Sequence, residues 1–422
     1  MSRIVSLCRN RYLFGVEMLK TIDASELKLG MAIHDLDCGW MEHPFIRSRF
    51  VIRSDEEIKK IRRAGIRGVV IDCERGIDVS YAPPLAVTLA KTETQLQRVA
   101  EENQQLRPSQ CSLTDEQGRA VHVKRQAIEV VRTVMKDARL GRAIEIDNVE
   151  FAVQRITDSV FRNQGALLGL LRIKNKDNYT FLHSVSVCTL MVAFCRSRGL
   201  ADDVIVQAGI GGLLHDTGKA LVPDNILNKG GRLTDEEFEI VKCHPRDGYH
   251  ILKNSPDIGE IVLDITLHHH ERRDGTGYPC KQREDDISEL AQMAAIVDVY
   301  DAITSDRSYH KGICAAEALR KIYQWSEFHF NPILTQEFMR CVGIYPVRTL
   351  VLLESGRLGI VIESHESNLL TPKVRVFFNS KTRAYMPPAT VDLSRPVGFG
   401  GGDKIVSFEK PEAWGIDVKR FM

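Results

Sequence analysis

The sequence predicts a mainly α-helical protein, in which a large helical domain is preceded by a small α+β module and followed by a small β-rich appendix. Apolar residues recur at helical spacing from about residue 121 to residue 343. Shorter β-rich runs stand before and after that stretch. With 422 residues and 43% hydrophobic content, the chain is long enough to bury cores in two or three domains.

The segment from residue 21 to residue 80 carries apolar, strand-like runs near both of its ends. Between them, Ser54 and Glu57 have the spacing of a capping box, in which each side chain bonds the backbone amide of the other residue. An apolar helical face follows the box. We therefore expect an α+β module here, after an N-terminal extension over residues 1–20.

Pro84 ends the module, and a polar stretch follows it. Leu96, Val99 and Leu106 are too sparse in this stretch to predict a buried stripe. We interpret residues 81–120 as a linker or an exposed helix rather than a domain. The stretch is a candidate for homodimer contacts, although so few apolar residues argue against a stable coiled coil.

Residues 121–343 are expected to fold as one helical domain with its own core, because apolar stripes recur throughout them. After Pro346 the pattern changes to β-rich runs separated by Ser-Gly and Ser-Asn turns, which predict a small appendix over residues 344–422. The predicted strands are 349–353, 358–362 and 374–378.

The composition excludes several classes of protein. A formal net charge of +1 produces no global field toward nucleic acid or an acidic membrane, and the three tryptophans form no stacking pattern, so no nucleic-acid polymer is expected as a partner. No apolar run approaches the roughly 20 residues that span a bilayer, and no signal-peptide core is evident. The ten cysteines form no Cys-x-x-Cys pair and are interpreted as reduced packing residues. We expect a cytoplasmic location.

Candidate metal-binding side chains are most concentrated at residues 268–279, where His268, His269 and His270 precede an acidic loop that contains two glycines. A second feature is the adjacent pair His215 and Asp216, since an imidazole can bind one metal ion while the neighbouring carboxylate bridges to a second. Taken alone, such a pair is more often structural. The helical domain, however, also carries further candidate ligands at His183, His244 and Asp298.

Mixed imidazole and carboxylate ligands suit iron, manganese or zinc better than magnesium or calcium. Two such ions about 3.5–4 Å apart can activate a bridging hydroxide and hold a phosphodiester for in-line attack. Lys219 follows the His-Asp pair closely and offers a point charge to an anionic group. The pattern therefore indicates a metal centre assembled from several helices.

The helical domain resembles the HD-GYP subgroup of the HD-domain metal-dependent phosphohydrolases, whose known members are mostly cyclic di-GMP phosphodiesterases. Residues 22–72 resemble an accessory domain often found ahead of HD-GYP domains. The complete ordered set of motifs is far more specific than the His-Asp pair alone. The matching segments are residues 179–184, 215–219 (HDTGK), 223–229, 233–237, 244–248, 269–279 and 298–307.

Carried over position by position, the resemblance implies a centre of two divalent metal ions, expected to be iron or manganese. Asp216 would bridge the ions, Lys219 would contact the scissile phosphate, and Arg307 would contact the phosphate or guanine of the substrate. The implied metal ligands are His183, His215, Asp216, His244, His269, His270 and Asp298.

Several positions leave alternatives open. A glutamate that recruits a third ion in some members is replaced here by Tyr179, so two ions are expected. His268 is interpreted as an extra histidine, and Asp301, one helical turn after Asp298, as an outer contact rather than a ligand. The resemblance places the glycine loop at 275–279 at the edge of the site and in contact with partners, for example diguanylate-cyclase domains; the alternative is a structural turn.

The resemblance implies that a hydroxide activated by the two ions hydrolyses cyclic di-GMP, either to linear pGpG or on to GMP, lowering this second messenger. Two alternatives stand beside this function. One is a cyclic di-GMP receptor or scaffold without turnover. The other is a phosphohydrolase of another cyclic dinucleotide, which His310 at an often basic position keeps open.

Overall fold

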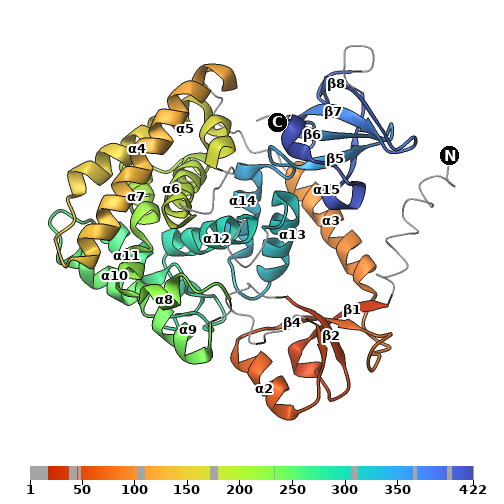
Figure 1. The fold of residues 1–422 in the computed structure, drawn as a ribbon, viewed down its shortest axis with the longest axis horizontal. Coiled ribbons are helices and arrows are strands. Elements are labelled where there is room, and N and C mark those ends of the chain that lie inside the picture. Colours follow the sequence, from red (N-terminus) through yellow and green to blue (C-terminus); the bar gives the residue numbers. More distant parts are fainter. Residues whose placement is uncertain are drawn as a thin grey trace. The chain divides into compact units, whose positions relative to one another are not determined.

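The structure is a computed structural model that describes residues 18–37, 45, 49–101, 110–171, 179–231, 233–305, 312–364, 368–396 and 402–421. The chain divides into two compact units. The smaller unit lies within residues 1–95 together with 231–236, and the larger unit contains the rest of the chain. Figure 1 shows both units coloured along the sequence.

The smaller unit is the predicted α+β module. Its four strands form an antiparallel sheet in the order β1-β4-β2-β3. Ser54 caps the helix through the expected capping box with Glu57, and the apolar face of the helix buries Ile58 and Ile61. The elements are β1 (Leu19–Asp23), η1 (Ala24–Glu26), β2 (Ala32–Leu36), β3 (Phe50–Val51), α2 (Asp55–Arg63) and β4 (Gly68–Asp72).

The stretch interpreted as a linker contains a long helix, α3 (Leu85–Glu101). Leu96 and Val99 are only 3% and 5% exposed, and the Val99 carbonyl accepts a hydrogen bond from Arg340 at 3.1 Å. The expectation that these residues are too sparse to be buried was therefore wrong. A sparse stripe is buried here because the covering surface comes from a segment far away in the sequence. Leu106 lies outside the described residues.

Helices dominate the larger unit, as predicted, although they begin before residue 121. Figure 1 shows α6 and α12 in the interior of this bundle, and both are apolar on nearly every side, as expected for buried helices. The helices are α4 (Leu113–Arg139), α5 (Ile146–Leu171), α6 (Tyr179–Ser197), α7 (Asp202–Leu214), α8 (Asp224–Leu227), α9 (Asp235–Val241), α10 (His244–Lys253), α11 (Glu260–His268), α12 (Glu289–Thr304), α13 (Ala315–Trp325) and α14 (Pro332–Val342), with η4 (Thr217–Leu221) and η5 (Glu284–Asp286) between them.

One helix of the described chain, α6, is long and apolar enough in composition to cross a membrane. Its apolar window, Thr180–Ser197, is 83% buried inside the protein. The helix packs against α5, α7 and α12. Protein contacts therefore account for its apolar surface.

The C-terminal region is a five-stranded antiparallel sheet in the order β8-β7-β6-β5-β9. One set of its apolar side chains, including Val351, Val361 and Val374, belongs to the same core as the helices. The other set, including Leu358 and Phe377, packs with residues of the C-terminal helical turns. The elements are β5 (Leu350–Leu353), β6 (Arg357–Glu363), β7 (Lys373–Asn379), β8 (Ala384–Asp392), β9 (Ile405–Phe408), α15 (Pro411–Trp414) and η6 (Val418–Phe421).

Strands β5, β6 and β7 coincide with the three predicted runs, whereas β8 and β9 were not predicted. Strand β8 contains Pro387 and Pro388, and most of its side chains are exposed. It lies at the edge of the sheet, where proline is tolerated because half of the backbone amides face solvent. An exposed edge strand has no apolar alternation from which a sequence pattern can be read.

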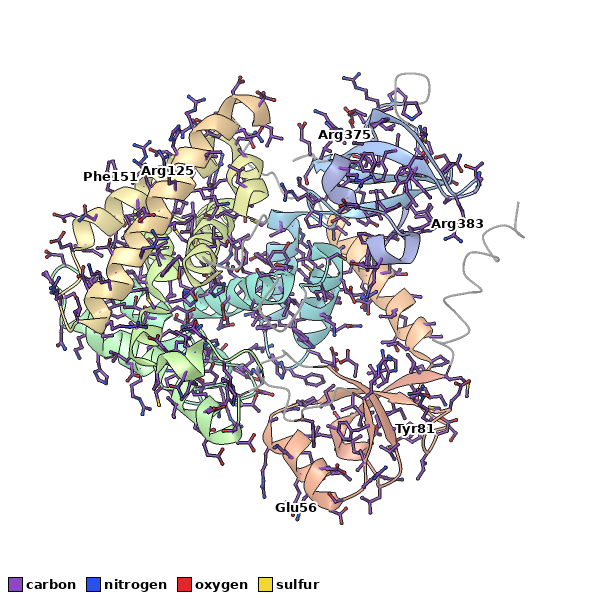
Figure 2. All side chains as sticks on the ribbon, in the orientation of Figure 1. Glu56, Tyr81, Arg125, Phe151, Arg375 and Arg383 are labelled. Carbon is purple, nitrogen blue, oxygen red and sulfur yellow. The ribbon has the colours of Figure 1, made fainter. Side chains whose placement is uncertain are left out.

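A buried ion pair joins the two longest helices of the larger unit. Glu116 of α4 is fully buried and accepts hydrogen bonds from Ser159 at 2.8 Å and from Arg162 at 2.7 and 2.9 Å. Burial alone raises the pKa of Glu116, but the bonds from Arg162 and Ser159 outweigh it and the pKa is lowered from 4.5. Other side chains of this helix pair, such as those of Arg125 and Phe151, are exposed (Figure 2).

Replacing Glu116 by glutamine should lower the free energy of unfolding by about 3 kcal/mol, the low end for a broken buried pair, since Arg162 is 30% exposed. Urea denaturation followed by circular dichroism measures this difference. Glu129→Gln is the matched control on the same helix, because its pair with Arg132 is exposed and contributes under about 1 kcal/mol. A folded pKa below the unfolded one means that the Glu116 contribution is present above the ordinary pKa of 4.5 and is lost as the pH falls through the folded pKa. Equal losses in the two variants would contradict the assignment.

Candidate metal centre

The seven residues implied as metal ligands converge on one buried point of the larger unit. They come from the interior or the end of five helices, because His215 and Asp216 are adjacent in the sequence, as are His269 and His270. Their exposed fractions are at most 5%, except for His270, whose side chain is 11% exposed. The ligands are His183 in α6, His215 and Asp216 after α7, His244 at the start of α10, His269 and His270 after α11, and Asp298 in α12.

The carboxylate of Asp216 stands between two groups of imidazoles. Its Oδ2 lies 3.4 Å from Nε2 of His215 and 3.6 Å from Nε2 of His183. Its Oδ1 lies 3.3 Å from Nε2 of His244 and 4.0 Å from Nε2 of His269. The two oxygens of one carboxylate therefore face different groups, which is the arrangement that a bridging ligand requires.

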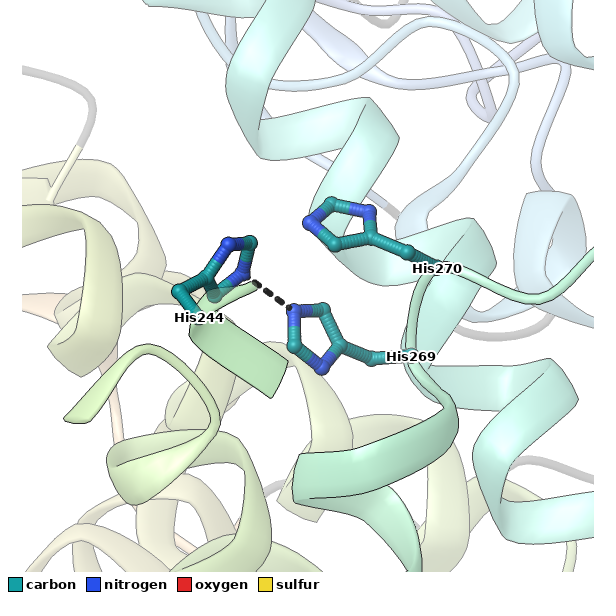
Figure 3. Close-up of side chains that lie close together, drawn as sticks. All are labelled: His244, His269 and His270. Carbon is teal, nitrogen blue, oxygen red and sulfur yellow. Dashed lines mark hydrogen bonds between the residues drawn. The ribbon is translucent and has the colours of Figure 1, made fainter. Parts of the chain in front are cut away.

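Potential ligand atoms gather within 4.8 Å of one another on both sides of Asp216. One group consists of His183, His215 and Asp298, and another of His244, His269 and His270. Figure 3 shows the second group, with the imidazoles of His269 and His270 facing that of His244. The structure thus offers two neighbouring sets of three candidate ligand residues, and a third group, His215, Asp216 and His269, overlaps both of them.

Hydrogen bonds to the second ring nitrogen orient four of the histidines. Nδ1 of His215, His244 and His269 lies 2.9, 2.7 and 3.0 Å from the backbone carbonyl of the residue three positions earlier. A carbonyl only accepts, so each Nδ1 carries a proton, and the other ring nitrogen, Nε2, is directed toward the centre. Nδ1 of His183 is held by Asp301 instead, at 2.6 Å.

The contact between His183 and Asp301 agrees with the interpretation of Asp301 as an outer residue. A carboxylate bonded to the far nitrogen of a ligand histidine fixes the ring and makes its metal-binding nitrogen more basic. His268, interpreted as an extra histidine, is bonded through Nδ1 to Asp264 at 2.7 Å. Asp264 also accepts from Ser288, the capping residue of α12. The spacing of four between Asp264 and His268 was a signal available in the sequence.

Electrostatics keep the carboxylates charged and several imidazoles neutral. Burial opposes charge on Asp216, but His215 and Lys219 hold its pKa well below the ordinary value of 3.8. The pKa of Asp298 is lowered in the same way by His183. Burial lowers the pKa of His269 well below 6.5 and that of His270 to about 3. Neutral imidazoles and charged carboxylates are the protonation states that bind metal.

Gly218 allows the His-Asp pair to approach α10. A Cβ atom at this position would lie 2.0 Å from the carbonyl oxygen of His244 and 2.5 Å from the amide nitrogen of Gly248. Any side chain would therefore separate η4 from the helix that carries His244. The glycine of the HDTGK motif is explained by this close packing.

Lys219 lies at the same place, with its ammonium 2.7 Å from Oδ2 of Asp216 and its side chain 15% exposed. It neutralises part of the buried negative charge and lies within reach of any anion at the centre. Arg307 and His310 lie outside the described residues, as does the side chain of Tyr179.

The loop at 275–279 lies at the edge of the centre, and its Tyr278 forms an aromatic wall that the sequence argument did not single out. The ring of Tyr278 lies 4.7 Å from that of His270, at an angle of 31°, and 6.5 Å from that of His244. Burial raises the pKa of Tyr278 well above 10 and the charge of Asp298 raises it further, so the phenol stays neutral. The part of the family motif that holds no ligand is therefore in contact with two of the ligand residues.

The buried donor atoms themselves fit metal ions. Nε2 of His215, Nε2 of His270 and Oδ1 of Asp216 are buried and make no hydrogen bond within the described part of the chain. A buried polar atom left in this state costs about 1–3 kcal/mol, and coordination to a cation removes that cost. The imidazole and carboxylate set suits a transition metal better than calcium or magnesium.

Comparisons with known proteins agree with this geometry. Residues 172–334 match the family model described as an HD domain, and residues 19–149 match a domain of unknown function, DUF3391. A Pseudomonas aeruginosa protein named as a cyclic di-GMP phosphodiesterase is 43% identical over 404 residues, which cover 94% of each chain. A Thermotoga maritima protein of the same name is 35% identical over 200 residues, covering 45% of this chain and 54% of that protein.

Among solved structures, the HDG"Y"P protein Bd1817 from Bdellovibrio bacteriovorus has a TM-score of 0.45 and 20% identity, covering 76% of this chain and 98% of that chain. The family assignment rests on the extended sequence identity and on the matched HD domain. The chain belongs to the HD-GYP subgroup of the HD-domain metal-dependent phosphohydrolases, with a DUF3391 domain on its N-terminal side.

Proposed function

We propose that this protein hydrolyses cyclic di-GMP, to linear pGpG or on to GMP, at a centre of two metal ions. The observation that carries the proposal is the Asp216 carboxylate, whose two oxygens face two separate groups of buried histidines. The full-length relative from Pseudomonas aeruginosa, named for this activity, supports the choice of substrate.

The ligand residues have distinct roles in this proposal. His183, His215 and Asp298 would hold one ion, His244, His269 and His270 would hold the other, and Asp216 would be shared between them. When bound, two divalent ions supply a water activated for in-line attack and neutralise charge on the phosphodiester. The donor set suits iron, manganese or zinc, and the resemblance to the family favours iron or manganese among them.

Lys219 and Arg307 act on the substrate in this proposal. The ammonium of Lys219 borders the centre through Asp216 and is placed to stabilise the negative charge that develops on the phosphate. Arg307 follows α12 in the sequence and is assigned to the phosphate or guanine of the dinucleotide by its position in the family motif. The buried site excludes bulk water, which strengthens each of these electrostatic contacts.

Two alternatives remain for the same site. A receptor without turnover would need no complete metal centre, yet every expected ligand is present and converges, which favours catalysis. A phosphohydrolase of another cyclic dinucleotide would use the same metal chemistry and differ only in how the bases are bound.

Purified protein loaded anaerobically with iron or manganese should convert cyclic di-GMP to pGpG, as followed by chromatography. The other cyclic dinucleotides, assayed in parallel, test the substrate preference. Binding of cyclic di-GMP without any pGpG, in a sample that contains two ions per chain, would refute the enzymatic function. Faster turnover of a different dinucleotide would refute the proposed substrate.

Asp216→Ala and Lys219→Ala should separate metal binding from charge stabilisation. Loss of the bridging carboxylate should remove metal and activity together while the helical circular dichroism signal persists. Loss of the ammonium should leave metal content unchanged and lower kcat by about 100-fold or more, as expected when one stabilising group is removed from a transition state. Metal analysis and steady-state kinetics measure both effects, and unchanged metal content in Asp216→Ala contradicts the bridge.

Asp301→Asn should weaken metal binding by about 10–100-fold, because the amide can donate to Nδ1 of His183 and favour the tautomer with a protonated Nε2. Titration with Mn²⁺ measures the change. Asp264→Asn removes the same kind of contact from His268, which is in neither ligand group, and is the matched control. Equal weakening in both variants would mean that the effect is not specific to a ligand histidine.

A further inference from the structure

The loop that carries Tyr278 is fastened by a buried carboxylate. Glu271 is 2% exposed, and its side chain accepts hydrogen bonds from three successive backbone amides. The amides of Cys280 and Lys281 donate to Oε1 at 2.6 and 3.1 Å, and that of Gln282 donates to Oε2 at 3.0 Å. Bonds from backbone amides to a charged carboxylate are stronger than bonds between neutral groups.

The backbone at Lys281 makes this convergence possible. Its φ of +57° is in the left-handed region, which a residue with a side chain seldom adopts. A left-handed residue within a turn points successive amides into one concave surface, and such a surface binds an anion. In this loop the bound anion is the side chain of Glu271 itself.

The other end of the loop is packed just as closely against the ligand segment. The amide of Tyr278 donates to the carbonyl of His270 at 3.2 Å. A Cβ atom on Gly277 would lie 2.4 Å from the amide nitrogen of Arg272, so the backbones touch without room for a side chain. Tyr278 is thereby held between two fastened points, with its ring against His270.

His270 depends on this contact more than the other ligand histidines do. Its imidazole makes no hydrogen bond among the described residues, and its nearest carboxylate is Asp298, at 3.8 Å from Nδ1. His215, His244 and His269 are each oriented by a backbone carbonyl. For His270, packing by Tyr278 takes the place of that bond.

We propose that Glu271 is a positioning residue, which holds the loop at 275–282 so that Tyr278 orients the imidazole of His270 for metal binding. The inference rests on the metal centre of the proposed function. It gives the non-ligand part of the family motif a role inside the site. Loss of the Glu271 carboxylate should loosen the loop, release His270 and weaken the ion held with His244 and His269, while the ion at His183, His215 and Asp298 stays bound.

Glu271→Gln tests this role with little change of shape. Both carboxylate oxygens accept from the loop, so an amide group at either position loses at least one acceptor. Hydrogen exchange followed by mass spectrometry should show the amides of Cys280, Lys281 and Gln282 exchanging about tenfold faster, the effect of losing one charge-assisted bond. Titration with Mn²⁺ should show one of two sites weakened by about tenfold and the other unchanged.

Asp285→Asn is the matched control, because it removes one exposed negative charge from the neighbouring η5 without touching the loop amides. It should leave exchange and both Mn²⁺ affinities as in the unmodified protein. Glu271→Gln behaving like Asp285→Asn in both measurements would overturn the inference. So would an equal weakening of both ions together with a lowered melting temperature, which indicates a general loss of stability.

The two proposals fail in different ways. If the unmodified protein binds no Mn²⁺ or Fe²⁺, the proposed metal centre is wrong, and the positioning of a ligand falls with it. If the protein binds two ions and Glu271→Gln binds both normally, only the role of Glu271 is wrong.

Discussion

The shared carboxylate of Asp216 is the contact on which the rest of the site depends. It is buried among imidazoles from four helical segments, with Lys219 as its nearest cation. A buried carboxylate is costly unless positive charge or strong hydrogen bonds surround it. The surrounding residues supply one ammonium and several lone pairs that face inward. That balance favours cations at the centre and explains why several imidazoles surround one aspartate.

Backbone carbonyls orient the rings of three of these histidines, so that Nε2 of each is directed toward the centre. Three histidines are placed at helix ends, where the carbonyl three residues earlier holds Nδ1. Such carbonyls have no partner within their own helix and are free to accept from a side chain. Each of these hydrogen bonds therefore gives a carbonyl at a helix end its partner and also places a proton on Nδ1 of the histidine. Rigid, largely apolar helices such as α6 and α12 keep the ligand positions constant because their packing allows little movement.

Residues that are not candidate ligands hold the ligand residues in place through several kinds of contact. Asp301 orients His183 by a hydrogen bond, Gly218 brings η4 against α10, and Tyr278 covers His270. The C-terminal sheet contributes to the same apolar core as the helices, so it is part of the larger unit rather than a detached appendix.

The sequence by itself determined the helical class, the capping box of α2, strands β5 to β7 and the identity of the candidate ligands. These features depend on local spacing or on an ordered motif, both of which are visible along one chain. The tertiary structure decided what depends on a distant partner. Leu96 and Val99 are buried by surfaces that no local pattern reveals, and β8 is a strand because it pairs with β7 despite its prolines. Only the fold could place the two oxygens of Asp216 toward separate groups, because that geometry is set by helices that are remote in sequence and joined by packing.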